Sequence, residues 1–194
     1  MRRRSAIPTL LLSAVVVLTG CEVGDPVADF GPGAPTADSP ELPADRGLDV
    51  GEVDAPSDLP PQDARLAEVD WPAAAGWIAR ENAAGRPVVI NFFASFCEPC
   101  KRELPLLLET AAAEGDVSFL GVHTNEQLGL GDEMVDEYDI AFPTFHDPTG
   151  DVVFEVGGRG LPHTVAFDTD GRLVSRIFGE LTESSLAQLL DEAR

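Results

Sequence analysis

The feature that most constrains the fold is a short apolar run followed at once by a pair of cysteines. Residues 87–93 have the sequence PVVINFF, which is rich in β-branched and aromatic residues and is typical of a strand buried on both faces. Cys97 and Cys100 follow directly, in a segment whose composition predicts a helix over residues 97–113. A cysteine pair therefore begins a helix at the end of a buried strand, which indicates a fold of the α/β class.

The spacing of the two cysteines places them on one face of that helix. Residues at i and i+3 are neighbours on a helix, so Cys97 lies at the exposed amino terminus and Cys100 one turn further in. The free N–H groups and positive potential of a helix N-terminus stabilise a thiolate, which is the reactive form of cysteine. Such a site can lower a cysteine pKa from about 8.5 to between about 3.5 and 7.5.

The pair by itself is compatible with a redox centre, a structural crosslink or half of a metal site. A disulfide that closes so short a ring constrains the unfolded chain little, which argues against a purely structural role. A zinc site would need further ligands from His123, His146 or His163, whose spacings match no zinc module. We therefore assign no metal ligands and favour thiol–disulfide exchange.

The amino terminus has the pattern of a bacterial lipoprotein signal peptide. Three arginines at positions 2–4 precede an apolar run at residues 6–18, which is short for a membrane span. Leu-Thr-Gly then precedes Cys21, and this resembles a lipobox. We predict that residues 1–21 are the signal segment and that Cys21 carries a lipid anchor; an ordinary signal peptide cut elsewhere is the alternative. Export would place the cysteine pair where disulfides persist.

The region after the signal segment differs in composition from the rest of the chain. Residues 22–65 are rich in Pro, Asp, Ala and Gly and contain few large apolar residues, so we predict a disordered, acidic tether there. We expect the folded domain at residues 66–194. The formal net charge of −21 excludes a nucleic-acid partner and leaves the acyl group at Cys21 as the membrane attachment.

Hydrophobic periodicity and turn residues predict an alternation of helices and strands after residue 66. Strand–helix–strand alternation implies a parallel part of the sheet, and the Asp-Thr-Asp-Gly turn at residues 168–171 implies an antiparallel hairpin. Thr182 is expected to cap the last helix. The predicted helices span residues 71–84, 97–113, 132–138 and 182–193, and the predicted strands span residues 87–93, 117–122, 142–146, 164–167 and 173–178.

Two segments resemble the thioredoxin superfamily, and in particular its TlpA/ResA branch of membrane-tethered thiol–disulfide oxidoreductases. They are NFFASFCEPCKRELP at residues 91–105 and GLPHTVAFD at residues 160–168. The resemblance extends over residues 67–194. It implies a thioredoxin fold, with a central mixed β-sheet flanked by helices, and a TlpA/ResA-type insertion at residues 119–150.

The resemblance also implies roles for individual residues. Cys97 would attack the substrate, and Cys100 would resolve the mixed disulfide. Pro162 would have a cis peptide bond and face the cysteines. An acid at the position of Glu103 tunes the thiols and relays protons in this branch; a solvated surface carboxylate is the alternative from the spacing alone.

Four further residues are expected to contact the substrate. Leu161, which precedes the proline, would dock the substrate backbone. Glu98 and Pro99 lie between the cysteines and Phe96 lies before them. The family commonly has Trp at the position of Phe96, so an indole N–H donor is missing here.

These observations predict an extracytoplasmic thiol–disulfide oxidoreductase that acts on proteins, most simply as a reductant in cytochrome c maturation. No cofactor beyond the Cys97–Cys100 disulfide is expected. A transmembrane electron donor of the CcdA/DsbD type would be its partner. The alternatives are an oxidant that introduces disulfides into exported proteins and a thioredoxin-like lipoprotein that binds or delivers copper.

Overall fold

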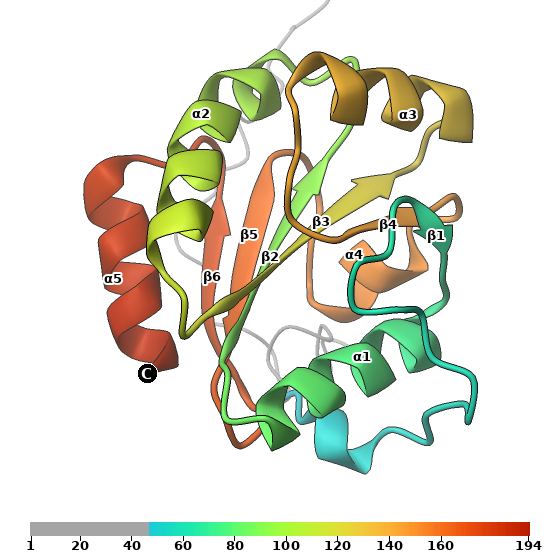
Figure 1. Cartoon of the computed structure of the whole chain (residues 1–194), viewed down its shortest axis with the longest axis vertical. Helices are drawn as coiled ribbons and strands as arrows, with labels where there is room; N and C mark the ends of the chain where they lie inside the picture. Colours follow the sequence, from blue (N-terminus) through green and yellow to red (C-terminus); the bar gives the residue numbers. More distant parts are fainter. Residues whose placement is uncertain (1–46) are drawn as a thin grey trace, which may run out of the picture. The chain divides into compact units, whose positions relative to one another are not determined.

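The computed structural model describes residues 47–194, which form a six-stranded sheet with helices on both faces (Figure 1). The strand order is β1-β4-β3-β2-β5-β6. The strands are β1 (Ala67–Glu68), β2 (Val88–Phe93), β3 (Ser118–Thr124), β4 (Thr144–Asp147), β5 (His163–Phe167) and β6 (Leu173–Phe178). The helices are the 3-10 helix η2 (Val50–Glu52), α1 (Trp71–Ala83), α2 (Glu98–Ala113), α3 (Leu128–Glu137), α4 (Asp151–Glu155) and α5 (Glu183–Ala193).

The sheet is mixed, as the element order predicted. Strands β1 to β4 pair in parallel, whereas β5 lies antiparallel to β2 and to β6. The predicted hairpin therefore forms one edge of the sheet. Strand β2 lies between β3 and β5, and all six of its residues are buried.

The alternating side chains of β2 explain why it is almost entirely apolar. Val88, Ile90 and Phe92 belong to the core that α1 and α4 cover. Val89 packs with α2 and α5 on the opposite face, and Phe93 packs with α2 and α3. Since neighbouring residues of a strand point to opposite faces, a strand covered on both faces has no polar side and shows no alternation in its sequence.

The last helix begins where its sequence predicted. The Thr182 hydroxyl accepts a hydrogen bond from the Ser185 N–H at 3.2 Å, and the Ser185 hydroxyl accepts one from the Thr182 N–H at 2.9 Å. These reciprocal bonds satisfy two backbone donors that would otherwise lack partners. The capping prediction for Thr182 is confirmed.

Besides η2, two short elements lie outside the predicted set, and one helix is longer than expected. β1 has two residues and α4 has five, too few for either to show a hydrophobic period. Helix α3 begins at Leu128, within a glycine-containing segment expected to be a loop. A Cβ at Gly131 would lie 2.5 Å from the His123 Nδ1 atom, so packing against that ring favours glycine inside this helix.

The ordered structure begins before residue 66, so the predicted boundary between tether and domain is too late. The Val50 N–H donates to the Gly171 carbonyl at 2.9 Å, and the Val50 side chain is only 3% exposed. Closer to β1, the Ala64 carbonyl accepts from the Thr144 N–H at 2.8 Å. The composition gave no sign of this, because a few apolar residues and backbone bonds to the sheet are enough to hold the segment.

The signal segment, Cys21 and residues 22–46 lie outside the described residues. Within residues 47–194, no helix is both long enough and apolar enough to cross a membrane.

Because Val50 is buried, shortening its side chain should lower the stability of the domain by a measurable amount. Val50→Ala should lower the free energy of unfolding by about 1–2 kcal/mol, because two methyl groups leave the core and a small cavity remains. Urea unfolding of the full-length chain measures this. Glu52→Ala, at an exposed position in the same short helix, is the control and should change little. Equal stability of the two variants would mean that residues 47–53 are not part of the cooperative unit.

Candidate functional site

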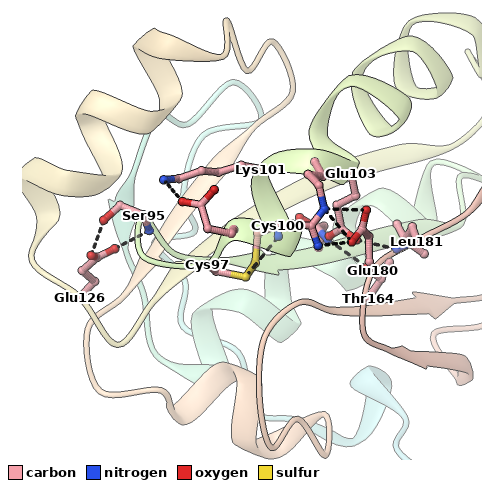
Figure 2. The surroundings of a disulfide bond; sticks show 12 residues. Ser95, Cys97, Cys100, Lys101, Glu103, Glu126, Thr164, Glu180 and Leu181 are labelled. Atoms are coloured by element: carbon pink, nitrogen blue, oxygen red, sulfur yellow. Dashed lines mark hydrogen bonds and ion pairs between the residues drawn. A yellow bond between two sulfur atoms is a disulfide. The ribbon is translucent and has the colours of Figure 1, made fainter.

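The cysteine pair lies at the junction of β2 and α2. The chain turns after Phe93, and the Cys97 N–H donates to the Ala94 carbonyl at 3.1 Å. Cys97 is then the N-cap of α2, where its Sγ accepts the Cys100 N–H at 3.2 Å. The two sulfurs are joined in a disulfide, with the Cα atoms 5.3 Å apart (Figure 2). Cys97 keeps 5% exposure and Cys100 keeps none, so any external group approaches the sulfur of Cys97.

The loop that contains Pro162 lies beside the disulfide. His163, the next residue, pairs with Phe92 of β2, and this register brings the start of β5 to the end of β2 from which the cysteines emerge. The Leu161–Pro162 peptide bond is cis, as the resemblance implied. Leu161 packs against the apolar cluster that includes both cysteines.

A surface hollow brings Cys97 together with the residues expected to contact a substrate. Phe96 and Phe154, which are 65% and 59% exposed, present apolar rings there. Phe154 belongs to α4 and was missed, because that helix was not predicted. The predicted residues that line this hollow are Phe96, Cys97, Glu98, Pro99 and Leu161.

Glu103 is buried, so the alternative of a solvated surface carboxylate is wrong. Only 2% of it is exposed. Its Oε1 accepts from the Asn91 side-chain amide and its Oε2 from the Leu181 N–H, both at 2.7 Å. Burial raises the pKa of Glu103 to about 7, against the opposing effect of these two hydrogen bonds. A carboxyl group with this pKa can gain or lose a proton near neutral pH.

Asn91 is a residue that the sequence-based prediction missed. It lies in the middle of β2, donates to Glu103, and also donates to the Thr164 hydroxyl at 3.0 Å. A signal was present, because Asn91 is the only polar residue in the run PVVINFF. A buried polar residue in an apolar strand requires a partner, and here the partner is the acid on α2.

Exposed charges surround the first turns of α2. Lys101 and Glu98 form an ion pair at 2.8 Å, and Arg102 pairs with Glu180 at 2.5 Å. The hydrogen bond from Lys101 lowers the pKa of Glu98. These pairs are solvated, so they contribute little to stability.

The three histidines lie in two separate places. His163 is buried and stacks between Phe92 and Phe178, and burial lowers its pKa. His123 and His146 lie against each other on β3 and β4. Within residues 47–194, His, Cys, Asp and Glu form no group of three or more arranged to hold a metal ion.

Comparison with protein families and curated proteins gives matches over most of the described domain. Residues 79–190 match the family model Redoxin. The thiol-disulfide oxidoreductase ResA of Oceanobacillus iheyensis is 31% identical over 112 residues, which cover 56% of this chain and 57% of that protein. ResA of Bacillus thuringiensis subsp. konkukian is 30% identical over 108 residues, covering 55% and 62%. The chain thus spans less than two thirds of the length of these relatives.

Solved structures with the same architecture confirm the predicted thioredoxin fold. The structure of MTB DsbF in its mixed oxidized and reduced forms superposes with a TM-score of 0.52 at 26% identity, covering 57% of this chain and 82% of that one. A putative thiol:disulfide interchange protein DsbE from Chlorobium tepidum has a TM-score of 0.55 at 21% identity, covering 60% and 84%. The latter similarity concerns the fold alone.

Proposed function

Since this chain belongs to the Redoxin family and is a TlpA/ResA-like member of the thioredoxin superfamily, we propose that it is a thiol–disulfide oxidoreductase acting on proteins outside the cytoplasm. The observation that carries this proposal is the asymmetry of the cysteine pair. Cys97 borders an open hollow at a helix N-terminus, while Cys100 is buried one turn below it. One sulfur can therefore meet a macromolecular substrate, and the other can act only on the first.

The reaction in the reducing direction transfers two electrons to the substrate. In the reduced protein, the Cys97 thiolate attacks a substrate disulfide, which forms a mixed disulfide and releases one substrate thiolate. The Cys100 thiolate then attacks the Cys97 sulfur. This step breaks the mixed disulfide, releases the second substrate thiolate and forms the Cys97–Cys100 disulfide. Two protons end on the substrate thiols.

Glu103 is suited to accept the proton that Cys100 must lose. The buried thiol of Cys100 cannot give its proton directly to bulk water. Glu103 follows it by three residues on the same helix face, is itself buried, and has a pKa of about 7. A base with this pKa can take up a proton during resolution and release it afterwards.

Residues around Cys97 form the docking surface in this proposal. Leu161, Phe96, Glu98 and Pro99 line the hollow beside Cys97, and Pro162 directly follows Leu161 in the chain. Apolar rings at Phe96 and Phe154 suit an exposed apolar segment of an unfolded or partly folded substrate.

The cellular setting belongs to the same proposal. A lipid on Cys21 would hold the domain at the outer face of the cytoplasmic membrane or in the periplasm. The reducing direction requires a transmembrane electron donor of the CcdA/DsbD type, and apocytochrome c is a substrate consistent with such a reductant. No bound cofactor is required, because the cysteine pair itself carries the electrons.

The reduction potential of the pair tests the direction of this reaction. The full-length chain should be equilibrated in defined thiol buffers and the fraction of Cys97–Cys100 disulfide measured, with bound metal assayed in parallel. A potential near −270 mV or lower, as in thioredoxin, is expected for a reductant, whereas a value near about −120 mV indicates an oxidant. Stoichiometric metal without a reversible disulfide would instead support metal binding and overturn the proposal.

A further inference from the structure

A partly buried carboxylate holds the loop that leads into the cysteine pair. Ser95 lies two residues before Cys97, between the end of β2 and the start of α2. Its N–H donates to the Glu126 Oε2 at 2.7 Å, and its hydroxyl donates to the Glu126 Oε1 at 2.5 Å (Figure 2). Glu126 follows β3, so these two bonds connect the cysteine loop to a neighbouring strand of the sheet.

Two histidines continue this connection into the interior. The His123 Nε2 lies 2.9 Å from the Glu126 Oε2, and the His123 Nδ1 lies 3.1 Å from the Nδ1 of His146. The two rings stack with their centroids 5.3 Å apart. His123 is fully buried, His146 is 4% exposed, and the Glu126 side chain is 10% exposed.

The proton positions follow from the chemistry of the groups. Burial raises the pKa of Glu126, but the hydrogen bonds from Ser95 and His123 outweigh this and hold the pKa below its usual value. The carboxylate is thus an acceptor only, and the Nε2 of His123 must carry a hydrogen. His146 then completes the chain, because its Nδ1 donates to a neutral His123 ring and accepts from a protonated one.

The surroundings leave the His123 ring little freedom to turn. Phe93 lies against it with ring centroids 5.7 Å apart, and Gly131 of α3 packs on it so closely that no Cβ would fit. At His146, burial and the His123 ring lower the pKa, whereas the charges of Glu68 on β1 and Asp147 on β4 act to raise it. The arrangement is therefore a fixed chain of donors and acceptors.

We propose that Glu126, oriented by the His123–His146 pair, is a positioning residue that fixes the Ser95–Cys97 loop in the conformation that presents Cys97 for exchange. This inference rests on the proposed function. The cysteines follow β2, which lies between β3 and β5 in the sheet. Glu126 would hold the loop from the β3 side, whereas Pro162 lies on the β5 side, just before that strand. Hydrogen bonds donated to a charged carboxylate are stronger than hydrogen bonds between neutral groups, which suits a loop that must hold one sulfur in place.

The first test removes the charge and one acceptor from the chain. In Glu126→Gln, the amide nitrogen cannot accept, so a donor of Ser95 or His123 loses its partner. The rate of exchange of the reduced full-length chain with a fluorescent disulfide peptide should fall about tenfold, which corresponds to about 1.4 kcal/mol in the barrier. Hydrogen–deuterium exchange at residues 94–97 should become faster. Glu133→Gln, an exposed glutamate of α3, is the matched control and should change neither quantity.

The second test separates hydrogen bonding from packing at His146. Gln can still bond the Nδ1 of His123, whereas Phe preserves the ring stack but offers no donor or acceptor. Positioning through the hydrogen-bond chain predicts that His146→Gln retains the exchange rate within about twofold and that His146→Phe loses about tenfold, which again corresponds to about 1.4 kcal/mol. A packing role predicts the opposite order, because Phe fills a buried ring site better than Gln.

The outcomes distinguish this inference from the proposed function. Absence of exchange by the wild-type chain would overturn the proposed function itself. Exchange by the wild type with equal rates for Glu126→Gln and Glu133→Gln would overturn the positioning role alone. If Glu126→Gln fails to fold, the order of the two His146 variants decides, and a faster Phe variant counts against the inference.

Discussion

We expect Cys97→Ser to abolish thiol–disulfide exchange and Cys100→Ser to stop it one step later, at the mixed disulfide. A serine hydroxyl is not ionised at neutral pH and cannot attack a disulfide, so the first variant should lose turnover by a factor on the order of a thousand or more. Cys100→Ser keeps the exposed nucleophile and loses only the buried resolving thiol. It should form a mixed disulfide with a protein substrate, visible as a higher-mass band on a non-reducing gel.

The third cysteine supplies the control for this experiment. Cys21→Ser removes a thiol that the proposal places outside the redox site, so the purified variant should exchange at the wild-type rate. Retention of full turnover by Cys97→Ser would disprove the mechanism. Accumulation of mixed disulfide by Cys97→Ser in place of Cys100→Ser would show that the roles of the two sulfurs are reversed.

The buried acid Glu103 should give the folded domain a characteristic dependence of stability on pH. Its pKa is about 7 in the folded protein, compared with about 4.5 for an ordinary glutamate. Between these values the carboxyl group binds more protons in the folded state than in the unfolded state, so the contribution of Glu103 to stability is greatest below about pH 4.5 and falls as the pH rises to about 7. The contribution of this one group over that range is about 3 kcal/mol.

Urea unfolding of the full-length chain between pH 4.5 and 8 measures this contribution. Glu103→Gln cannot titrate, so the stability of the wild type relative to this variant should fall by about 3 kcal/mol over this range. Its absolute stability should also be lower, because the glutamine nitrogen faces Asn91 or Leu181, both of which donate. Glu109→Gln, an exposed position on the same helix, should preserve the wild-type dependence. The same fall in Glu103→Gln as in the wild type would contradict the raised pKa.

The parts of the fold that could be predicted are those with strong local signals. The buried strand β2, the helix that follows it, the cap at Thr182 and the hairpin turn at residues 168–171 all depend on residues close together in sequence. The cis bond before Pro162 was implied by resemblance to a family and has no local signature in this chain.

The parts that could not be predicted depend on segments that are distant in sequence. The Val50 side chain is part of the core, and its N–H donates to the carbonyl of Gly171, more than a hundred residues later in the chain. Helix α4 is too short to show a period, yet it supplies Phe154 to the hollow beside Cys97. The start of the domain was predicted too late for the same reason, because the composition of a segment does not show that it will bond to a strand far along the chain.

The cysteine pair and its position at the start of a helix could be recognised in the sequence, because they are a local arrangement of neighbouring residues, and the resemblance to a family favoured redox chemistry. Tertiary structure decided how that chemistry is controlled. Helical spacing allowed Glu103 to be either exposed or buried. Only the packing of the folded domain buries the carboxyl group and raises its pKa, while the hydrogen bonds from Asn91 and Leu181 oppose that rise. The chain from Ser95 through Glu126 to the two histidines likewise exists only once β2, β3 and β4 lie side by side. Desolvation and hydrogen bonding between distant segments arise on folding, so no local pattern in the sequence encodes them.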